Sequence, residues 1–347
     1  MSQALWITGD LETSVGRVPQ VSTHLTWRDR LGTMMVRSNI QRMSYSVVPG
    51  LYAVGNPASD APVLVSANYK LSFDCLRKEL TGIDAWILVL DTKGINVWCA
   101  AGKGTFGTEE VIRMIKETNL SAAVSQRTLI LPQLGAPGVA AHIVQKHSGF
   151  RVIYGPVRAC DIPAFLESGL QASREMRKVR FDLSDRLAVV PVELMQWGKY
   201  ALFMAAILIL LAGLHSSGYN SDLALKNGVP AVLLVIIAFF TGGILTPALL
   251  PWLPGRAYSV KGAFLGLLLF PFLAFFHFLT PEKSGMPEFI SWLLMIPAIT
   301  SFLSLQFTGA TTFTSMSGVK REMRAALPVQ AAIAITGLLL WIWARFL

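Results

Sequence analysis

The sequence predicts an α/β domain built on a parallel sheet, followed by an all-α membrane domain of five transmembrane helices. Two observations carry this prediction. Short apolar runs alternate with amphipathic helix patterns within residues 60–170, and five long apolar segments follow residue 199. We therefore divide the chain into residues 1–195, which include an N-terminal extension and a basic juxtamembrane segment, and residues 196–347.

The first domain is organised as strand and helix patterns in alternation. Strands are predicted at 62–66, 85–90, 128–131 and 152–154. Helices are predicted at 71–80, 109–118 and 139–147, with a further helix after Asp161. Because this alternation is typical of a parallel sheet covered by helices on both faces, we expect a Rossmann-like α/β fold.

A single cysteine, Cys99, follows the second predicted strand in a short helix pattern. Asn96 is a good N-cap for this helix and Gly104 a good stop signal. Unpaired backbone N–H groups and the positive end of the helix dipole favour a thiolate in the first turn, and Lys103 adds a positive charge four residues on. This chemistry suits a nucleophile or an anionic ligand of a soft metal. A buried core cysteine is the alternative, since most free cysteines are core residues.

The predicted topology brings other segments to the same place as Cys99. In open α/β sheets, ligands bind outside the carboxyl ends of the strands. Cys99 and the turns 66–68 and 133–138 all follow predicted strands at that edge. Their convergence favours a functional role for Cys99 over a core position.

Residues 102–107 have the G-x-G-x-x-G spacing of dinucleotide-binding loops. In such loops the glycines follow their strand directly, and an acidic residue ends the next strand. Here the Cys99 segment intervenes, and the strand 128–131 is followed by Pro132 and Gln133. We therefore interpret these glycines as residues that end the short helix and turn the chain.

Five apolar segments are long enough to cross a bilayer as helices. They lie at about 200–217, 229–250, 262–280, 289–307 and 327–346, and lack Asp, Glu, Lys and Arg except for Arg345 in the fifth. The loops after the second and fourth segments carry five cations, against two in the alternate loops. The positive-inside rule then predicts a multi-pass protein of the cytoplasmic (inner) membrane, with the N-terminal domain in the cytoplasm and the C-terminus outside. The first fifteen residues show no signal-peptide pattern.

Charge and cysteine content exclude several classes of protein. The net charge is +9, but no basic stripe is interleaved with stacking aromatics, so we expect no nucleic-acid binding. The basic run within 174–180 suits either anionic lipid headgroups or a solvated helix face. The three scattered cysteines, Cys75, Cys99 and Cys160, indicate neither a disulfide framework nor a zinc site.

Several motifs resemble a known family. Segments 45–57, 63–73 and 131–138 resemble the corrinoid-binding domain of corrinoid iron–sulfur proteins. The segment 96–103 (Asn-Val-Trp-Cys-Ala-Ala-Gly-Lys), joined to a five-span membrane domain, resembles the membrane-anchored, mercury-methylating corrinoid proteins, and this resemblance covers essentially the whole chain. The four-cysteine iron–sulfur segment of the soluble relatives has no counterpart among the three cysteines.

The resemblance implies a base-off cobalamin and assigns residues to it. Cys99 is implied as the lower axial ligand of cobalt and as the catalytic residue. Ser66 matches a position that is usually threonine, where the hydroxyl suits a hydrogen bond to the corrin. The motif positions that pack the corrin face fall on Asn96, Val97, Trp98, Ala100, Ala101 and Gly102. The Asp-x-His-x-x-Gly signature of histidine-ligated cobalamin domains is absent from the sequence.

The resemblance also implies a reaction. A thiolate trans to a cobalt–methyl bond donates electron density strongly, which favours departure of methyl as a carbanion or radical. Hg(II) accepts a carbanion equivalent, so the implied activity is methyl transfer from a Cys-ligated methylcobalamin to Hg(II), giving methylmercury. A ferredoxin-like iron–sulfur protein as reductant and a methyl donor protein or methyl-tetrahydrofolate are the implied partners, alongside membrane lipid.

Two other functions stay open at this point. The first is a membrane-anchored corrinoid methyl carrier of one-carbon metabolism whose acceptor is not mercury. The second is a transporter or receptor whose first domain senses a ligand. The lack of ionisable residues within the apolar segments disfavours ion-coupled transport.

Overall fold

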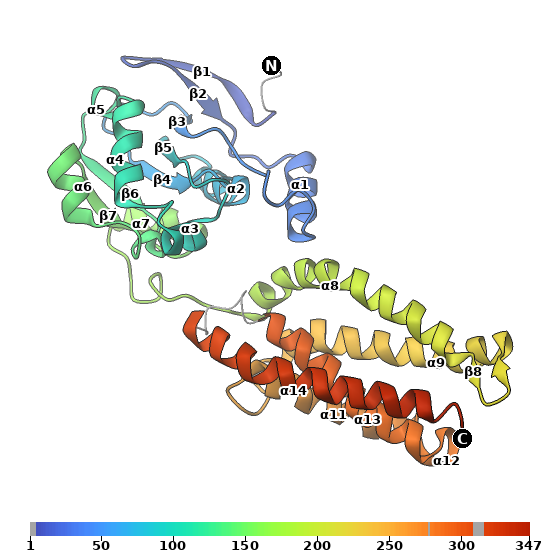
Figure 1. The fold of residues 1–347 in the computed structure, drawn as a ribbon. Coiled ribbons are helices and arrows are strands. Elements are labelled where there is room, and N and C mark those ends of the chain that lie inside the picture. The colour runs from blue at the N-terminus through green and yellow to red at the C-terminus, as the bar shows by residue number, and fades with distance from the viewer. Residues whose placement is uncertain (1–4, 277, 308–315) are drawn as a thin grey trace. The chain divides into compact units, whose positions relative to one another are not determined.

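The computed structural model describes residues 5–276, 278–307 and 316–347. The chain forms two compact units, the first ending at Arg180 and the second beginning at Phe181 (Figure 1). The sequence patterns placed the division after residue 195, whereas the two units divide at residue 180. The difference arises because α8 (Leu183–Ala212) is one continuous helix that starts well before its apolar part.

The first unit is an α/β domain. Its strands are β1 (Ile7–Thr13), β2 (Gly16–Val21), β3 (Gly50–Val54), β4 (Val63–Ala67), β5 (Ala85–Leu90), β6 (Thr128–Leu131) and β7 (Arg151–Tyr154). Its helices are α1 (Trp27–Arg37), α2 (Lys70–Arg77), α3 (Val97–Lys103), α4 (Thr108–Glu117), α5 (Leu120–Ala123), α6 (Ala141–Ser148) and α7 (Ile162–Glu167). Short 3-10 turns lie at Lys78–Leu80, Gln133–Gly135 and Ala159–Asp161.

One seven-stranded sheet runs through this unit in the order β1-β2-β3-β5-β4-β6-β7. The strands β5, β4, β6 and β7 are parallel, which confirms the predicted parallel sheet and its four strands. The sequence patterns missed β1, β2 and β3, and β3 pairs antiparallel with β5. The chain passes from β4 to β5 on one side and then crosses to β6 on the other, so the strand order reverses beside β4. Such a switch point is where open α/β sheets bind ligands.

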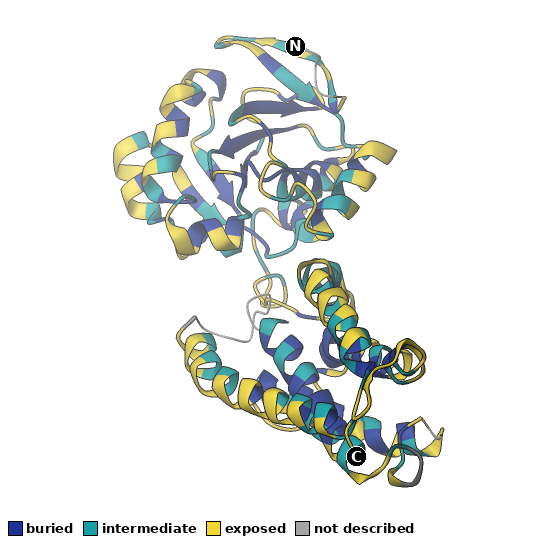
Figure 2. Ribbon diagram, turned by 45° about the vertical axis from the view of Figure 1, so that its right-hand side comes forward, coloured by how far each residue is buried: buried dark blue, intermediate teal, exposed yellow. Residues whose placement is uncertain are grey.

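Two apolar layers cover the sheet (Figure 2). On one face, side chains such as Val65 and Leu88 pack under α3, α4, α5 and α6. On the other face, Leu64 and Ile87 pack under α2 and α7. Successive residues of each strand alternate between the layers because side chains of a strand point to opposite faces. The central strands of the sheet are thereby held between two helical layers, whereas the edge strand β1 is half-exposed.

A buried cluster of four charged side chains joins α1 to α2. Lys70 Nζ lies 2.6 Å from carboxylate oxygens of both Asp29 and Asp74. Arg77 lies 3.1 Å from Asp29 and 2.7 Å from Asp74. Burial alone would raise the pKa of Asp29, but hydrogen bonds from Lys70 and Thr26 outweigh it and lower that pKa to about 2. The cluster fixes α2, the helix that follows β4, against the N-terminal segment.

The second unit is helical. Its elements are α8 (Leu183–Ala212), the hairpin β8 (Leu214–His215) and β9 (Gly218–Tyr219), α9 (Ser221–Phe240), a π-helical turn (Thr241–Leu245), α10 (Thr246–Leu249), α11 (Tyr258–Phe275), α12 (Pro281–Ser284), α13 (Met286–Gln306) and α14 (Met316–Trp343). Within the described residues, five helices are long and apolar enough to cross a membrane: Leu183–Ala212, Ser221–Leu249, Tyr258–Phe275, Met286–Gln306 and Ser317–Trp343.

The helix ends correct two predicted segments. The first was expected to reach residue 217, but the helix ends at Ala212 and residues 214–219 form the small hairpin, which Gly218 allows with a φ of +114°. The third was expected to reach residue 280, but α11 ends at Phe275, and residue 277 of that segment lies outside the described residues. In both places the sequence stays free of Asp, Glu, Lys and Arg past the end of the helix, so the absence of these residues does not mark where the helix ends.

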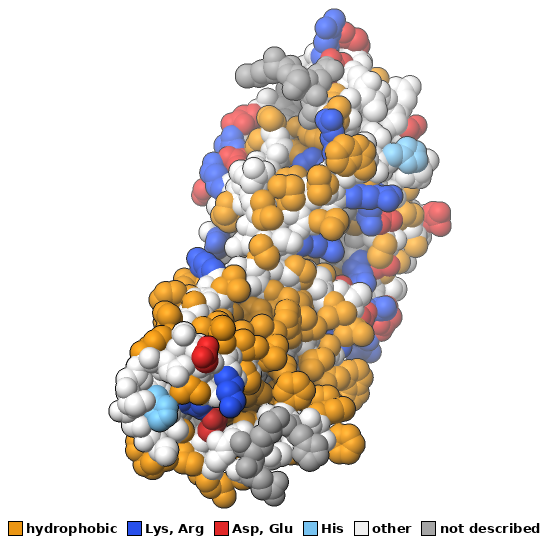
Figure 3. Space-filling view, turned by 90° about the vertical axis from the view of Figure 1, so that its right-hand side faces the viewer, with side chains coloured by type: hydrophobic (Ala, Val, Ile, Leu, Met, Phe, Trp, Pro, Cys, Tyr) orange, Lys and Arg blue, Asp and Glu red, His pale blue; other side chains and the backbone are white. Residues whose placement is uncertain are grey.

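Small residues let the helices of the second unit approach closely. A Cβ on Gly262 of α11 would lie 2.5 Å from the carbonyl oxygen of Thr300, and one on Gly266 would lie 2.8 Å from Cα of Pro297. Both neighbours belong to α13, which also packs against α9 and α14. Hydrophobic side chains dominate the visible face of this unit (Figure 3). Small residues at helix contacts and an apolar exterior are typical of membrane helices.

The buried ion cluster predicts acid sensitivity of α2. The pKa of Asp29 is lowered in the folded chain, so its stabilising contribution is complete above about pH 4 and is lost as the pH falls toward about 2. Amide exchange in α2 of the full chain, corrected for intrinsic rates, should show an opening free energy that falls by roughly 2 kcal/mol over this range. Asp29→Asn should cost about 3 kcal/mol near neutral pH and remove the acid-dependent part. The exposed Asp60 provides a matched control, Asp60→Asn, and equal behaviour of the two variants would contradict the assignment.

Candidate functional site

A cavity of about 370 Å³ opens at the carboxyl ends of β4 and β6, next to the switch point of the sheet. Its walls come from β4 and α2, from the start of α3, and from the segments that follow β6 and β7. Ser66 lines it from the end of β4, and Asn96, Val97 and Trp98 line it from the start of α3. The remaining lining is mostly apolar, including Leu131, Pro132, Leu134, Pro156 and Val157.

The helix that carries Cys99 begins and ends as its sequence predicts. The side-chain oxygen of Asn96 accepts a hydrogen bond of 2.9 Å from the backbone N–H of Cys99, which caps the first turn. Gly104 ends the helix in the left-handed conformation with a φ of +82°. Gly107 then precedes α4 as its N-cap residue. The interpretation of these glycines as turn residues is confirmed, and α3 is a short helix of about two turns, as its sequence pattern predicted.

Two alanines pack α3 against the core. Ala100 and Ala101 are buried in the apolar layer that α4 also covers. The turn after β6 comes so close that a Cβ on Gly138 would lie 3.0 Å from Cα of Ala101 and 2.2 Å from the carbonyl oxygen of Phe106. The buried face of α3 is therefore in close contact with the core, while Trp98 is 41% exposed and Cys99 is also exposed.

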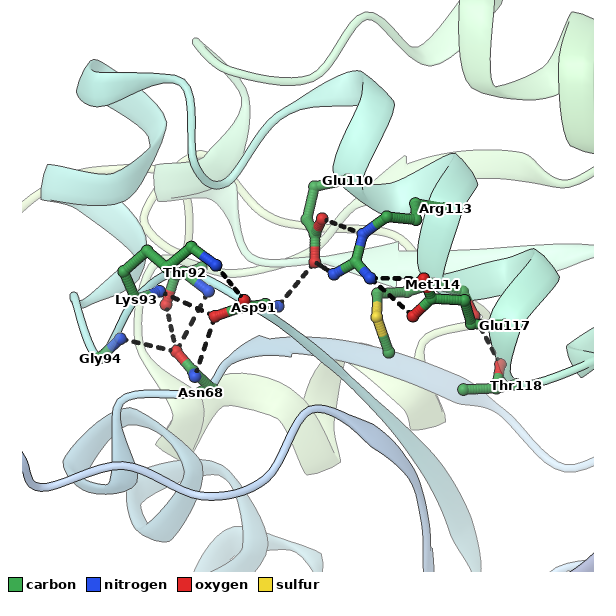
Figure 4. A network of polar contacts seen from close by, with 10 residues as sticks. All are labelled: Asn68, Asp91, Thr92, Lys93, Gly94, Glu110, Arg113, Met114, Glu117 and Thr118. Carbon is green, nitrogen blue, oxygen red and sulfur yellow. Dashed lines mark hydrogen bonds and ion pairs between the residues drawn. The ribbon is translucent and has the colours of Figure 1, made fainter.

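Asn68, immediately after β4, holds the loop that leads into α3 (Figure 4). Its side-chain oxygen accepts hydrogen bonds from the backbone N–H groups of Thr92 (3.1 Å) and Gly94 (2.9 Å). The Thr92 hydroxyl lies 2.8 Å from the same oxygen, and 2.6 Å from the carbonyl oxygen of Ile95. Asn68 and Thr92 are both buried, so these bonds are shielded from water. One amide side chain thus fixes the start of the Cys99 helix relative to β4.

A second set of contacts ties the same loop to α4. The backbone N–H of Asp91 donates to the Glu110 carboxylate at 2.7 Å, and Arg113 bonds that carboxylate at 2.7 Å (Figure 4). The Asp91 side chain accepts from Asn68 at 3.3 Å and also bonds Lys93. The hydrogen bond from Lys93 outweighs partial burial and holds the pKa of Asp91 below its ordinary value. The carboxylate therefore stays ionised and keeps the turn closed.

The structure brings part of the predicted set together. Ser66, Asn96, Val97 and Trp98 line one cavity, although Ser66 is far from the others in sequence. Cys99, Ala100, Ala101 and Gly102 belong to the same helix but do not line this cavity: Cys99 and Gly102 are exposed, and Ala100 and Ala101 face the core. Of the other cysteines, Cys75 lines the cavity from α2, and Cys160 is exposed in the turn before α7.

Sequence reasoning missed the residues that position α3. Asn68 and Gly138 were noted only as parts of the turns 66–68 and 133–138, and Thr92 carried no pattern of its own. The available signal was an asparagine directly after a buried strand, which often bonds neighbouring backbone groups. Within the described residues, no group of three or more His, Cys, Asp or Glu side chains is placed to hold a metal ion.

The chain is similar to known proteins, and the family model that it matches falls on this unit. Residues 24–166 match the family model of the CO dehydrogenase/acetyl-CoA synthase delta subunit. The chain is 35% identical over 128 residues to the acetyl-CoA decarbonylase/synthase complex subunit gamma of Methanopyrus kandleri, covering 36% of this chain and 27% of that subunit. The same subunit of Archaeoglobus fulgidus is 34% identical over 140 residues, covering 39% and 29%.

A third relative is the corrinoid/iron-sulfur protein large subunit of Moorella thermoacetica, 29% identical over 148 residues, or 42% of this chain and 31% of that subunit. The chain thus spans under a third of the length of the curated relatives that it matches. The similarity to the family model includes β4, α3 and the turn after β6, which together form the cavity and its rim.

The Asn68 contacts predict a specific loss of order. Asn68→Ala removes the acceptor for two buried N–H groups, which should cost about 2 kcal/mol and speed amide exchange across 92–103 roughly 30-fold. Exchange in α6, outside the network, should change little. Asn56 is exposed and follows β3, at the end of the sheet opposite to the cavity, and Asn56→Ala is the control. Unchanged protection of α3 in Asn68→Ala would refute the positioning role.

Proposed function

We propose that this chain is a corrinoid-dependent methyltransferase whose first unit holds a base-off cobalamin, with Cys99 as the lower axial ligand of cobalt. One observation carries the proposal. Ser66 and the residues Asn96–Trp98, from separate parts of the chain, meet in one cavity at the switch point of the sheet, and Cys99 is the next residue of the same helix. The similarity of this chain to a corrinoid/iron-sulfur protein large subunit supports it.

The residues present suit such a cofactor. The cavity is mainly apolar, with the Ser66 hydroxyl as one polar group in its wall. Trp98 offers a large, partly exposed aromatic surface at the start of α3, suited to the face of a flat macrocycle. Cys99 is exposed on the same helix, so its sulfur is accessible to a soft metal. These donors and surfaces would hold the cofactor, and Ala101 and Gly102 belong to the same helix without lining the cavity.

The chain's own residues would fix and tune the ligand. A bound cobalamin supplies a cobalt-bound methyl group. Cys99 would donate its sulfur electron pair to the metal, and Lys103 at the end of α3 would add positive charge near it. Ala100 and Ala101 would hold the helix against the sheet, so that the sulfur keeps one position. A strongly donating thiolate favours release of methyl as a carbanion or radical rather than as a cation.

We infer Hg(II) as the methyl acceptor, which gives methylmercury. The segment 96–103 together with a helical second unit supports this finer assignment, because that combination resembles the mercury-methylating corrinoid protein HgcA. The methyl group would leave with the bonding electron pair and form the new carbon–mercury bond. Turnover then calls for a ferredoxin-like iron–sulfur protein as reductant and for a methyl donor protein or methyl-tetrahydrofolate.

A second candidate is a corrinoid methyl carrier of one-carbon metabolism with a different acceptor. The relatives favour it, since they are subunits of an acetyl-CoA decarbonylase/synthase complex and of a corrinoid/iron-sulfur protein. In both candidates the second unit would anchor the first to the inner membrane. The five apolar helices support this anchoring role.

Substitution of Cys99 tests the proposed chemistry. Cys99→Ala should abolish methylmercury formation from Hg(II), even where cobalamin remains bound through Asn96, Trp98 and Ser66. Cys99→His supplies a harder, weaker donor and should keep cobalamin while leaving little activity. Cobalamin content and methylmercury are measured on the same samples. Near-normal output from a loaded Cys99→Ala protein would contradict thiolate ligation as the source of reactivity.

The other cysteines supply matched controls. Cys160→Ala, in an exposed turn, should retain both cofactor and activity. Cys75→Ala changes a side chain in the cavity wall, so the largest effect expected is a lower cobalamin content. The activity per bound cobalamin should be unchanged. Cobalamin-loaded wild-type protein that transfers methyl to another acceptor but not to Hg(II) would favour the one-carbon carrier.

Membrane topology is a separate prediction. The first unit and the loops with Arg256 and Arg321 should lie in the cytoplasm, and Lys226 and the C-terminus outside. Reporter fusions after residues 180 and 347 should therefore report opposite sides of the membrane. A cytoplasmic signal at residue 347 would require an even number of spans.

A further inference from the structure

An apolar groove of about 540 Å³ runs along the second unit, lined by α8, α9, α13 and α14. α8 contributes Trp197, Ala201, Met204 and Leu208 at successive turns, and α14 contributes Gln330 and Leu338. The distance from Trp197 to Leu208 along α8 corresponds to roughly 16 Å of helix. No charged side chain is among the groove's lining residues, all of which the structure describes. The groove therefore has the length and polarity of a site for a hydrocarbon chain.

Three lining residues carry a hydrogen-bonding side-chain group: Trp197, Tyr200 and Gln330. Tyr200 is 54% exposed, whereas the polar atoms of the other two are buried. The indole N–H of Trp197 and the amide oxygen of Gln330 are buried, and neither has a hydrogen-bond partner among the described residues. Gln330 is 7% exposed. Buried polar groups are nearly always satisfied, because leaving one unpaired forfeits its bonds to water. The indole N–H groups of Trp292 and Trp341 are also unpaired among the described residues, but neither residue lines the groove. What indicates a ligand with both capacities is therefore that a donor and an acceptor lie together in the wall of one groove.

The orientation of Gln330 follows from its neighbours. The Ser301 hydroxyl donates its single proton to the carbonyl oxygen of Ser259 at 2.8 Å. It can therefore only accept from Gln330, whose amide nitrogen lies 2.7 Å away. Ser259 is held in turn by the Glu322 carboxylate, at 2.8 Å from its backbone nitrogen. This chain of bonds commits the amide nitrogen of Gln330 and leaves its oxygen as the available acceptor.

Both polar groups lie at the same end of the groove. Gln330 bonds Ser301, and the Trp197 ring packs edge-on against Phe302 with ring centroids 4.8 Å apart. Ser301 and Phe302 are consecutive residues of α13, so the two groups reach the same level of that helix. Towards Leu208 and Leu338 the lining is apolar. The groove thus has a polar end and an apolar length, which is the pattern of an amphiphile.

We propose that this groove binds one uncharged amphiphile with a hydroxyl-bearing head and a single hydrocarbon tail. The hydroxyl oxygen accepts from Trp197, and its proton is donated to Gln330. The tail lies along α8 and α14 towards Leu208. A charged headgroup is disfavoured because the lining offers no counter-charge. This assignment concerns the second unit alone and stands independently of the cobalamin proposal.

Photolabelling of the full chain tests the proposal. The protein is reconstituted in phosphatidylcholine nanodiscs with a diazirine-bearing hexadecanol or with its methyl ether, which accepts a hydrogen bond but donates none. The alcohol should label peptides of α8, α13 and α14. Gln330→Leu and Trp197→Phe should each lower that labelling about fivefold to tenfold, and the ether should label the wild-type chain as weakly.

A pair of alanines on α14 provides the steric control. Ala334 lines the groove, and Ala332 is exposed and lines none of the described cavities. Ala334→Trp should block labelling, and Ala332→Trp should preserve it. Equal labelling by alcohol and ether in the wild-type chain would overturn the proposal, since it shows unspecific uptake of acyl chains. Crosslinks between two copies through the groove, without labelling, would also overturn it. The ether comparison needs no variant, so a misfolded substitution does not block the test.

Discussion

The side-chain oxygen of Asn68 sets the geometry on which the candidate site depends. It binds backbone N–H groups of Thr92 and Gly94 and so ties the end of β4 to the loop that follows β5. The helix α3 begins at Val97, three residues after Gly94, and the side-chain oxygen of its N-cap Asn96 fixes the backbone of Cys99. A short helix is marginal by itself, so its position has to come from such tertiary contacts. The Cys99 sulfur is therefore placed by residues that have no chemical role of their own.

Packing beneath α3 extends the same constraint to the turn after β6. Gly138 passes so close to Ala101 and Phe106 that no side chain fits there. As a result, the ends of β4, β5 and β6 are connected through one small helix, and the cavity lies along its rim. The few residues that suit a corrinoid are therefore held in place by contacts of other residues, such as Asn68 and Gly138. This division is typical of sites built on a rigid sheet, where loops carry the chemistry.

Local patterns predicted the parts of this architecture that depend on neighbouring residues. Apolar runs located β4 to β7, and Asn96 with Gly104 located α3 between its caps. Contacts between distant residues were not predictable in this way. The residues of β1 are half-exposed and form a strand through their pairing with β2. Asn68 binds the backbone of residues more than twenty positions away in the sequence. The unpaired groups of Trp197 and Gln330 likewise emerge only when α8 and α14 line one groove.

The central claim is that Cys99 of this chain binds cobalt through sulfur, and X-ray absorption at the cobalt edge tests it most directly. Full-length protein loaded with cobalamin is compared with Cys99→Ala loaded to the same cobalt content. The account predicts a sulfur scatterer in the first coordination shell of the wild-type protein, replaced by nitrogen or oxygen in the variant. A wild-type spectrum without sulfur at cobalt, in protein with bound cofactor, would contradict it.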